Sequence, residues 1–308
     1  MPEICDYEGS AYRTEFWTPE RRFEDLADRY AIRALLPPGG DTLIEVGAGF
    51  GRLANLYDGY RQVVLFDYAL SLLLEARAQW GHDRRFLFVA GDVYRMPLAS
   101  RVFDTVVMVR VLHHLEDVPA ALRHLARILR PGGVLVLEFA NKRHLKAILR
   151  YALRRQSWSP FAPEPHPFVP LNYDFHPAWV RARLAEVGLR VEKVRAASHF
   201  RIPWLKRHVP PQLLARMDAM LQRWGAPFQL SPSVFLRARC PGEMAGARAA
   251  LAFRCPACGF EPLPIQGEDV VCPHCEGVWA YRDGIFNFKE PVRPPRSEAL
   301  ASPETPAT

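Results

Sequence analysis

Short apolar runs alternate with helical segments along most of this 308-residue chain, and no other sequence feature constrains the fold as strongly. Runs that are apolar on both faces are typical of strands in a sheet that helices cover on both sides. The predicted strands are residues 43–46, 63–66, 86–90, 102–109, 134–140, 189–194 and 233–238, and the predicted helices are 19–35, 70–78, 119–129, 177–187 and 200–227. The pattern therefore predicts an α/β fold with a seven-stranded, mostly parallel sheet and helices on both faces.

The composition is that of a folded globular chain. Hydrophobic residues make up 49% and charged residues 24% of it, so burial can offset the entropy of ordering the chain. The longest apolar runs, such as 106–109, are far shorter than the roughly 18 residues that cross a bilayer. The first ten residues lack the pattern of a secretory signal, so we expect a cytoplasmic protein. A net charge of +7 permits a nucleic-acid or anionic partner without indicating one.

Changes in composition divide the chain into expected parts. Proline and glycine at 37–40 end the first helix, and a basic, proline-rich stretch interrupts the later alternation. A tail rich in proline, serine, alanine and glutamate is typical of disorder. The expected parts are an N-terminal helical segment (1–40), the α/β domain (41–240) with an insert (141–175), a linker (241–251), a cysteine module (252–290) and a disordered tail (291–308).

A glycine-rich turn follows the first predicted strand, where Glu45 is followed at every second position by Gly47, Gly49 and Gly51. Glycines let the backbone turn tightly and approach a ligand, and the amides at the start of the next helix then face that ligand. Asp67 lies 20 residues after Gly47 at the end of the next predicted strand, where a carboxylate can accept both hydroxyls of a ribose. These two positions agree, and they favour a nucleoside-containing ligand over a turn without one.

The identity of that ligand is indicated by the surrounding motifs. A dinucleotide fingerprint requires glycine or alanine at the position of Arg52, and here the third glycine comes one residue early. The pattern E-x-G-x-G-x-G, the acid ending the second strand, Gly91-Asp92 after the third, and L-R-P-G-G before the fifth together resemble the class I S-adenosylmethionine-dependent methyltransferases. The resemblance covers about residues 15–240 and is closest to the broad group that includes the quinone-biosynthesis methyltransferases. It implies a Rossmann-like fold.

The resemblance also implies roles for the matching residues. The glycine loop and the acid before it surround the methionine part of the cofactor, and the acid ending the second strand binds the ribose, with Tyr68 beside it near the adenine. Asp92 accepts from the adenine amino group, Val93 packs by the ring or offers its amide, and Arg110 lies near the methionine amino group through its backbone. The implied cofactor-binding residues are Glu45, Gly47, Gly49, Gly51, Asp67, Tyr68, Asp92, Val93 and Arg110.

Two histidines after the fourth predicted strand are the candidate catalytic residues. The sulfonium already activates the methyl group, so the protein mainly holds methyl, sulfur and nucleophile in line, and a general base is optional. His113 and His114 lie where substrate-facing residues often lie, with His113 the more expected to face the pocket. A structural role for each stays open. Tyr173 and Asp174 are further candidates to line an acceptor pocket, against a packing role in their loop.

Cys255, Cys258, Cys272 and Cys275 form two CxxC knuckles in the cysteine module. Two such knuckles present four thiolates to one tetrahedral ion, so they predict a structural zinc site, with His274 outside it. The module resembles the small zinc-ribbon activator that partners RNA and release-factor methyltransferases, here fused to the enzyme. A fold-stabilising appendage and a substrate-recruiting module are both open interpretations.

Residues 142–155 carry six cations and no acid. This basic helix is able to contact RNA phosphates, or to lie on an anionic membrane surface beside leucines at helical spacing. The plain alternative is a solvated helix that packs its leucines on the domain. Aromatic residues in the loop that follows suggest a lid over an aromatic or apolar acceptor.

These features together predict methyl transfer from S-adenosylmethionine to a small-molecule or lipid-like acceptor. The Asn/Asp-Pro-Pro-Tyr/Phe motif of exocyclic-amine methylators does not follow the fourth strand, and no cysteine near the strands supports a covalent cytosine mechanism. An RNA or translation-protein acceptor recruited by the cysteine module is the main alternative. A catalytically silent cofactor-binding scaffold is a third interpretation, and an NAD oxidoreductase is remote.

Overall fold

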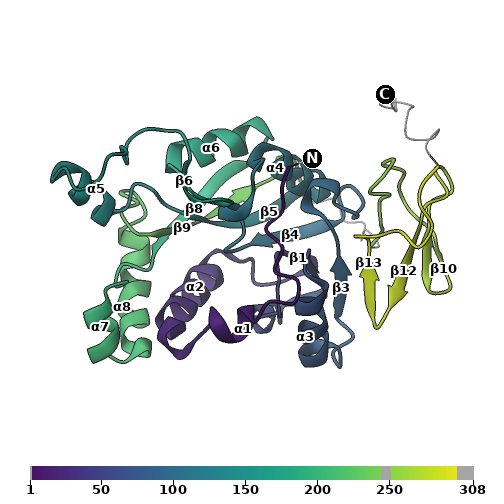
Figure 1. Cartoon of the computed structure of the whole chain (residues 1–308), viewed down its shortest axis with the longest axis horizontal. Coiled ribbons are helices and arrows are strands. Elements are labelled where there is room, and N and C mark those ends of the chain that lie inside the picture. Colours follow the sequence, from purple (N-terminus) through teal and green to yellow (C-terminus); the bar gives the residue numbers. More distant parts are fainter. Residues whose placement is uncertain (1, 244–250, 297–308) are drawn as a thin grey trace.

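The computed structural model describes residues 2–243 and 251–296, which are organised around one large mixed sheet (Figure 1). The helices are α1 (Tyr12–Glu15), α2 (Arg22–Leu35), α3 (Leu70–Trp80), α4 (Val118–Ile128), α5 (Leu145–Ala152), α6 (Pro177–Glu186), α7 (Pro203–His208) and α8 (Pro211–Trp224). The strands are β1 (Gly40–Val46), β2 (Tyr60–Asp67), β3 (Phe86–Ala90), β4 (Phe103–Met108), β5 (Leu129–Ala140), β6 (His166–Val169), β7 (Asn172–Asp174), β8 (Arg190–Ala197), β9 (Ser233–Arg239), β10 (Ile265–Gln266), β11 (Asp269–Val271), β12 (Val278–Arg282) and β13 (Ile285–Asn287). Short 3-10 helices are η1 (Pro19–Arg21), η2 (Ala54–Leu56), η3 (Val93–Arg95) and η4 (Leu112–His114).

The order of strands across the sheet is β10-β11-β12-β13-β3-β2-β1-β4-β5-β9-β8. Strands β1 to β5 pair in parallel with one another, whereas β9 runs antiparallel between β5 and β8. The run from β3 to β8 holds the seven strands expected from the apolar runs, so the predicted α/β fold is confirmed. The strand order reverses between β1 and β4, and ligands of such sheets bind at the carboxyl ends of the strands at this point.

Two layers of core explain why the strands are apolar on both faces. In β1, Ile44 packs on the side covered by α4 and α6, whereas Leu43 packs on the side covered by α2 and α3. Every residue of β4 is buried. Helix α8 adds a smaller contact, because Leu214 and Ala215 pack against Phe23 of α2. The sheet thus lies between helices on both faces, as the alternation predicts.

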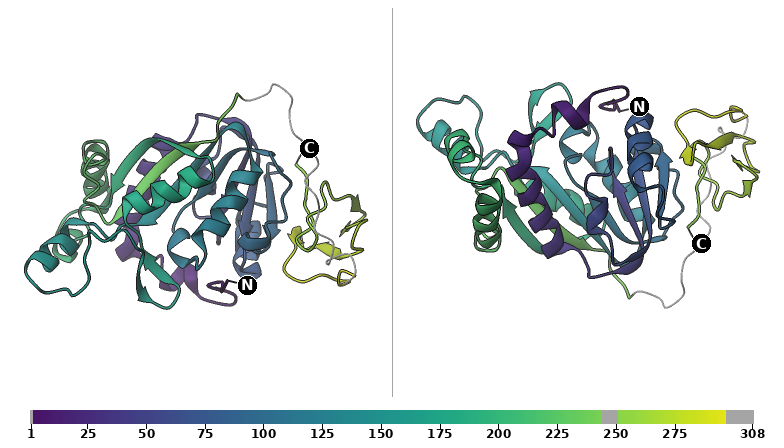
Figure 2. Two further views of the ribbon diagram at one scale, coloured as in Figure 1. Left: turned by 90° about the horizontal axis from the view of Figure 1, so that it is seen from above. Right: turned by 90° about the horizontal axis from the view of Figure 1, so that it is seen from below.

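The cysteine module extends the sheet instead of standing apart from it. Strand β13 pairs in parallel with β3, in the register Ile285 to Phe88 and Asn287 to Ala90. At a second contact, the Ala99 N–H donates to the Ala252 carbonyl at 3.0 Å. Figure 2 shows the module against this edge in both views. The docking removes an exposed β3 edge that would otherwise be free to pair with other chains.

The insert and the later helices differ in detail from the expectation. The helix expected within 142–155 is the shorter α5, and the proline-rich stretch after it contains the antiparallel pair β6–β7. The single helical region expected at 200–227 is divided into α7 and α8. Pro210 and Pro211 explain the division, since proline disfavours helix at the residue before it and begins a new helix at its first turn.

The ends of the cysteine module also differ from the expectation. Residues 291–296, expected to begin the disordered tail, are held against the module, because the Arg296 N–H donates to the Cys275 carbonyl and Arg293 bridges to Val278. Most of the expected linker (241–251) and the rest of the tail lie outside the described residues. Among the helices that are described, none has the length and apolarity needed to cross a bilayer.

Candidate functional site

The glycine loop lies between β1 and η2, at the reversal of strand order. All three glycines have positive φ angles, for which a side chain is unfavourable. At Gly47 a Cβ would also come within 2.1 Å of the Val111 side chain. The close approach of the loop to the segment after β4 therefore requires glycine. Because the glycines have no side chains, the loop presents its backbone at the carboxyl ends of β1 and β4.

Asp67 at the end of β2 holds the glycine loop. Its Oδ2 accepts from the Gly49 N–H at 2.6 Å, and its Oδ1 accepts from the Ala69 N–H at 2.9 Å. Burial raises the pKa of the Asp67 carboxyl above its ordinary value, although these backbone donors oppose the rise. A carboxylate fixed in this way beside a pocket has remaining lone pairs that are able to accept ligand hydroxyls.

A pocket opens directly over this arrangement. It is walled by the glycine loop, by the ends of β2 and β3, by the segment after β4 and by the first residues of the chain. The lining residues are Ile4, Cys5, Tyr7, Tyr12, Val46, Gly47, Gly49, Phe66, Asp67, Tyr68, Leu72, Gly91, Val93, Arg110, Val111, His114 and Leu115. Most of the predicted cofactor residues therefore meet at one cavity. The Asp92 side chain instead caps η3, where it accepts from the Tyr94 N–H at 2.7 Å.

Glu45 lines a smaller pocket that shares Tyr12, Gly47 and Arg110 with the first. Its side chain is buried, and its Oε2 has no hydrogen-bond partner among the described residues. Burial raises the pKa of Glu45 to about 8. The buried Tyr57 hydroxyl lies near the carboxyl and lowers the Glu45 pKa in part, but the two groups do not have hydrogen-bond geometry. A buried carboxylate oxygen without a donor is costly, and a cationic donor in the pocket would offset that cost.

Arg110 connects the end of β4 to helix α2. Its φ is 62°, and its backbone N–H donates to Glu138 Oε2 at 3.0 Å. Its guanidinium forms two hydrogen bonds to the fully buried Asp28. Arg52, after the glycine loop, pairs with Asp25 of the same helix at 2.6 Å. The charged side chains thus fasten α2 beneath the site, and the Arg110 backbone remains at the pocket wall.

The two candidate histidines are placed differently. His114 lines the pocket, with Nδ1 3.1 Å from the Leu171 carbonyl and Nε2 3.2 Å from the Tyr7 hydroxyl. His113 is buried beside it, and its Nδ1 has no partner among the described residues. Burial lowers the pKa of both imidazoles, so both are neutral at pH 7. The expectation that His113 is the one facing the pocket is wrong, because His114 forms the wall.

The first residues of the chain form a wall that sequence reasoning missed. Residues 2–17, here called the N-terminal arm, bring Tyr7 and Tyr12 into the pocket. Glu8 anchors the arm, since its carboxylate accepts from the N–H groups of Leu70 and Ser71 at the start of α3. Lys289 of the cysteine module lies 3.4 Å from Glu8 Oε2 and 4.1 Å from the centre of the Tyr68 ring. The only sequence signal for the arm is its high content of aromatic residues.

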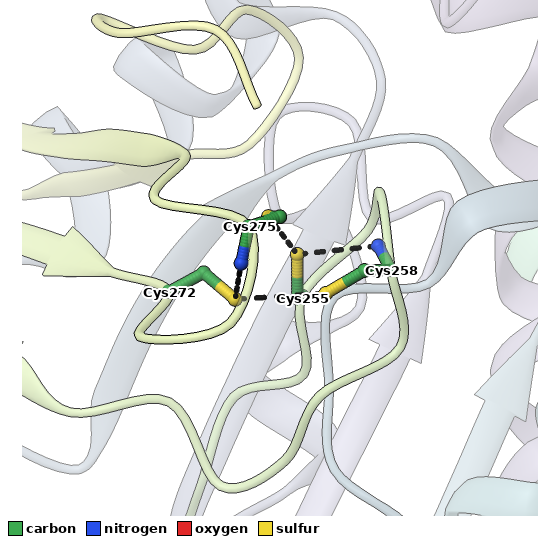
Figure 3. A group of neighbouring side chains, drawn as sticks. All are labelled: Cys255, Cys258, Cys272 and Cys275. Carbon is green, nitrogen blue, oxygen red and sulfur yellow. Dashed lines mark hydrogen bonds between the residues drawn. The ribbon is translucent and has the colours of Figure 1, made fainter. Parts of the chain in front are cut away.

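The four cysteines of the knuckles form one cluster (Figure 3). Their Sγ atoms all lie within 4.8 Å of one another, and two pairs lie 3.6 Å apart. Tetrahedral zinc with thiolate bonds of about 2.3 Å separates its sulfurs by about 3.8 Å, so the donor set fits that ion. The N–H groups of Cys258 and Cys275 point to the Sγ atoms three residues earlier. His274 is exposed and lies outside the cluster.

Comparisons with known proteins agree with this geometry. Residues 44–137 match the family model described as a methyltransferase domain. The chain is 38% identical over 120 residues to demethylmenaquinone methyltransferase of Mycobacterium marinum, which covers 37% of this chain and 50% of that protein. It is 32% identical over 129 residues to 27-O-demethylrifamycin SV methyltransferase of Amycolatopsis mediterranei, covering 39% and 46%. The chain thus spans about half the length of these relatives.

Solved structures share the fold at lower identity. One is a chain from the complex between a Haloferax volcanii methyltransferase activator and a candidate methyltransferase, with a TM-score of 0.53, 19% identity, and coverage of 75% of this chain and 97% of that one. Another is a candidate S-adenosylmethionine-dependent methyltransferase of Listeria monocytogenes, with a TM-score of 0.52, 14% identity, and coverage of 71% and 99%.

The strand order and the pocket at its reversal are typical of nucleoside-binding α/β domains, and the matches are to methyltransferases. Residues 44–137 match a methyltransferase domain, and the fold is that of the class I S-adenosylmethionine-dependent methyltransferases. A tetracysteine module consistent with a small zinc ribbon follows the α/β domain.

Replacing Asp67 by alanine is expected to weaken S-adenosylmethionine binding about 10- to 100-fold, because hydrogen bonds to a charged group contribute about 1.5–3 kcal/mol. Isothermal titration calorimetry measures the change. Asp58→Ala removes an exposed carboxylate outside the pocket and serves as the matched control. Unchanged affinity in the Asp67 variant would remove Asp67 from the binding site.

The raised pKa of Glu45 predicts that cofactor binding releases a proton. Its pKa of about 8 keeps the carboxyl mostly protonated at pH 7, whereas an ammonium group in the pocket favours the ionised form. Binding at pH 7 should therefore release about one proton, and affinity should rise between pH 6 and 8. Calorimetry in two buffers of different ionisation enthalpy measures the proton.

The Glu45→Gln variant should bind without this release. Glu138→Gln is the matched control, because Glu138 is also buried with a raised pKa but already accepts from the Arg110 backbone. A release that persists in the Glu45 variant would mean that another group titrates on binding.

Proposed function

We propose that this chain transfers a methyl group from S-adenosylmethionine to a small-molecule or lipid-like acceptor by direct in-line displacement. The observation that carries the proposal is the unpartnered, buried Glu45 Oε2 beside the glycine loop. It fits the ammonium of a methionine, while Asp67 fits a ribose on the other side of the loop. The two relatives reported above, demethylmenaquinone methyltransferase and 27-O-demethylrifamycin SV methyltransferase, have small or lipid-like molecules in their names. This favours that class of acceptor for the chain.

The residues that would hold the cofactor follow from these positions. Glu45, the glycine loop and the Arg110 backbone would bind the methionine end, and Asp67 would bind the ribose hydroxyls. Val93 would pack against the adenine, with Asp92 and Tyr68 nearby. When bound, S-adenosylmethionine supplies a methyl group already activated by its sulfonium. The N-terminal arm would exclude water from the part of the pocket that Tyr7 and Tyr12 line.

Proton transfer, where the acceptor requires it, would fall to His113 after β4 and to Asp174 at the end of β7. Only the buried His113 has a nitrogen without a partner among the described residues, and its lowered pKa makes it a weak proton acceptor, whereas both nitrogens of His114 are engaged. Burial raises the pKa of Asp174 to about 6, so this carboxyl is ionised at pH 7 and is a second candidate acceptor of the proton. The main contribution of the chain remains positioning, which alone supplies much of the rate of such reactions.

An RNA or translation-protein acceptor is the second candidate function. One solved structure with the same fold comes from a complex with a methyltransferase activator. In this chain the cysteine module docks on the β3 edge and reaches the cofactor pocket through Lys289. In this alternative the module would recruit the macromolecule, together with phosphate contacts from the basic residues of 142–155.

A labelling experiment tests the proposal and separates the candidates. The purified protein and methyl-labelled S-adenosylmethionine are incubated with lysate, and the product is divided into organic-extractable and macromolecular fractions. We expect label in the organic extract, and much less of it with Asp67→Ala when the cofactor is not saturating. Label in macromolecules, removed by ribonuclease or protease, would overturn the small-acceptor proposal. Cofactor binding without transfer to any fraction would indicate a silent scaffold.

We propose further that the tetracysteine cluster holds structural zinc. The module is too small to build a sufficient core alone, so the metal would stabilise it. The purified chain should contain about one zinc per molecule by elemental analysis, and Cys255→Ser should lower this content together with the melting temperature. Cys240→Ser, outside the cluster, should change neither. Chelation that leaves the melting temperature unchanged would contradict a stabilising role.

A further inference from the structure

Helix α5 lies at the end of the sheet opposite the cysteine module (Figures 1 and 2). An apolar stripe runs along it. Leu145, Leu149 and Leu153 are spaced four residues apart and therefore lie on one face of the helix. They are 51%, 53% and 64% exposed. Leucines at this exposure in a regular stripe indicate a contact that the described residues do not provide.

Helix α8 carries a second stripe on the side away from the core. Its inner face packs Leu214 and Ala215 against α2. At roughly 100° per residue, the exposed apolar side chains of α8 fall within a stripe about 100° wide on the other face. They are Leu213, Met217, Met220, Leu221 and Trp224. Trp224 is 77% exposed, so this stripe also lacks a partner among the described residues.

The two stripes line one open groove. Leu149 of α5 and Leu153 directly after that helix line the groove. Leu221 and Trp224 of α8 line it from the other side, together with Phe228 beyond the end of that helix. Its polar lining is basic, from Lys146, Arg150, Arg155 and Arg201, and none of the described residues that line it is acidic. We call this surface, formed by the exposed sides of α5 and α8 and the groove between them, the docking face.

Cations outnumber acids in both chain segments that form the docking face, although Arg201 and Lys206 are paired with the buried Glu24 of α2. Residues 141–163 contain six lysines and arginines and no acid. Residues 199–232 contain five lysines and arginines and one acid, Asp218. Asp218 is fully buried, where it accepts from the backbone N–H groups of Ser198 and His199. It therefore adds no negative charge to the surface.

We propose that the docking face binds the surface of an anionic phospholipid bilayer. Its leucine, methionine and tryptophan side chains would enter the headgroup region, and the surrounding cations would bind lipid phosphates. An RNA would use the cations and aromatic rings but would leave the leucine and methionine stripes exposed. A second copy placed on the same face would bring like charges together. A bilayer matches both the apolar stripes and the charge.

The docking face also adjoins the acceptor end of the candidate site. Arg201 lines the groove, and its charge helps to lower the pKa of His113 while opposing the raised pKa of Asp174. Docking would therefore bring a bilayer-resident molecule close to the site. Binding to the bilayer does not depend on methyl transfer, so the two proposals fail separately.

Vesicle co-sedimentation tests the proposal with the full chain. Vesicles of phosphatidylcholine alone are compared with vesicles that also contain phosphatidylglycerol, at low and high salt. We expect binding to the anionic vesicles, weakened by salt, with little binding to the neutral ones. Failure to bind anionic vesicles at low salt, or equal binding to both kinds, would overturn the proposal.

Paired variants identify the surface. Leu149→Ser with Trp224→Ser removes apolar contact, and Arg150→Glu with Arg155→Glu reverses charge; each pair should weaken binding more than tenfold. Leu74→Ser and Arg84→Glu are the matched controls, since both side chains are exposed elsewhere. Unchanged melting temperature and cofactor affinity verify that the variants fold. Variants that bind vesicles as well as the original chain, or that instead dissociate a dimer or release RNA, would contradict the docking face.

Discussion

A buried carboxylate at the end of the central strand is the constraint on which the site depends. Glu45 is carried by β1, which lies in the middle of the sheet and is flanked by β2 and β4. Its position is therefore fixed by two ladders of hydrogen bonds, and it cannot turn to water. Burying an acid without a full set of donors costs stability, and the fold tolerates the cost at the point where a cationic ligand would remove it.

Contacts around Glu45 hold the glycine loop and helix α2 in place beside it. Glycine at 47 lets the loop approach the segment after β4, and Asp67 ties the loop to the end of β2. Buried ion pairs from Arg110 and Arg52 fasten α2 below. The cysteine module closes the β3 edge and places Lys289 beside Tyr68, so that a distant part of the chain supports the same pocket.

The sequence predicted the parts of this arrangement that have strong local signals. Buried strands were visible as apolar runs, and the glycine loop with Asp67 was visible from its spacing. The pairing of β13 with β3 could not be predicted, because it involves only three residues of each strand and their register is set only in the folded chain. The N-terminal arm has no periodic pattern. The division between α7 and α8 does have a sequence signal, because the adjacent Pro210 and Pro211 end one helix and begin another.

The histidines show a further limit of sequence reasoning. Adjacent residues in a short 3-10 helix point in different directions, and the direction of each depends on contacts from distant segments. His114 is held in the wall by Tyr7 and Leu171, which lie far from it in sequence. The spacing of His113 and His114 alone therefore could not assign them to wall and interior.

The most direct test of the account is a crystal structure with S-adenosylhomocysteine bound. We predict its amino group within hydrogen-bond distance of Glu45 Oε2, its ribose hydroxyls on Asp67, and its adenine beside Val93. A ligand bound elsewhere, or one that leaves Glu45 without a partner, would contradict the central claim that this carboxylate defines the cofactor site.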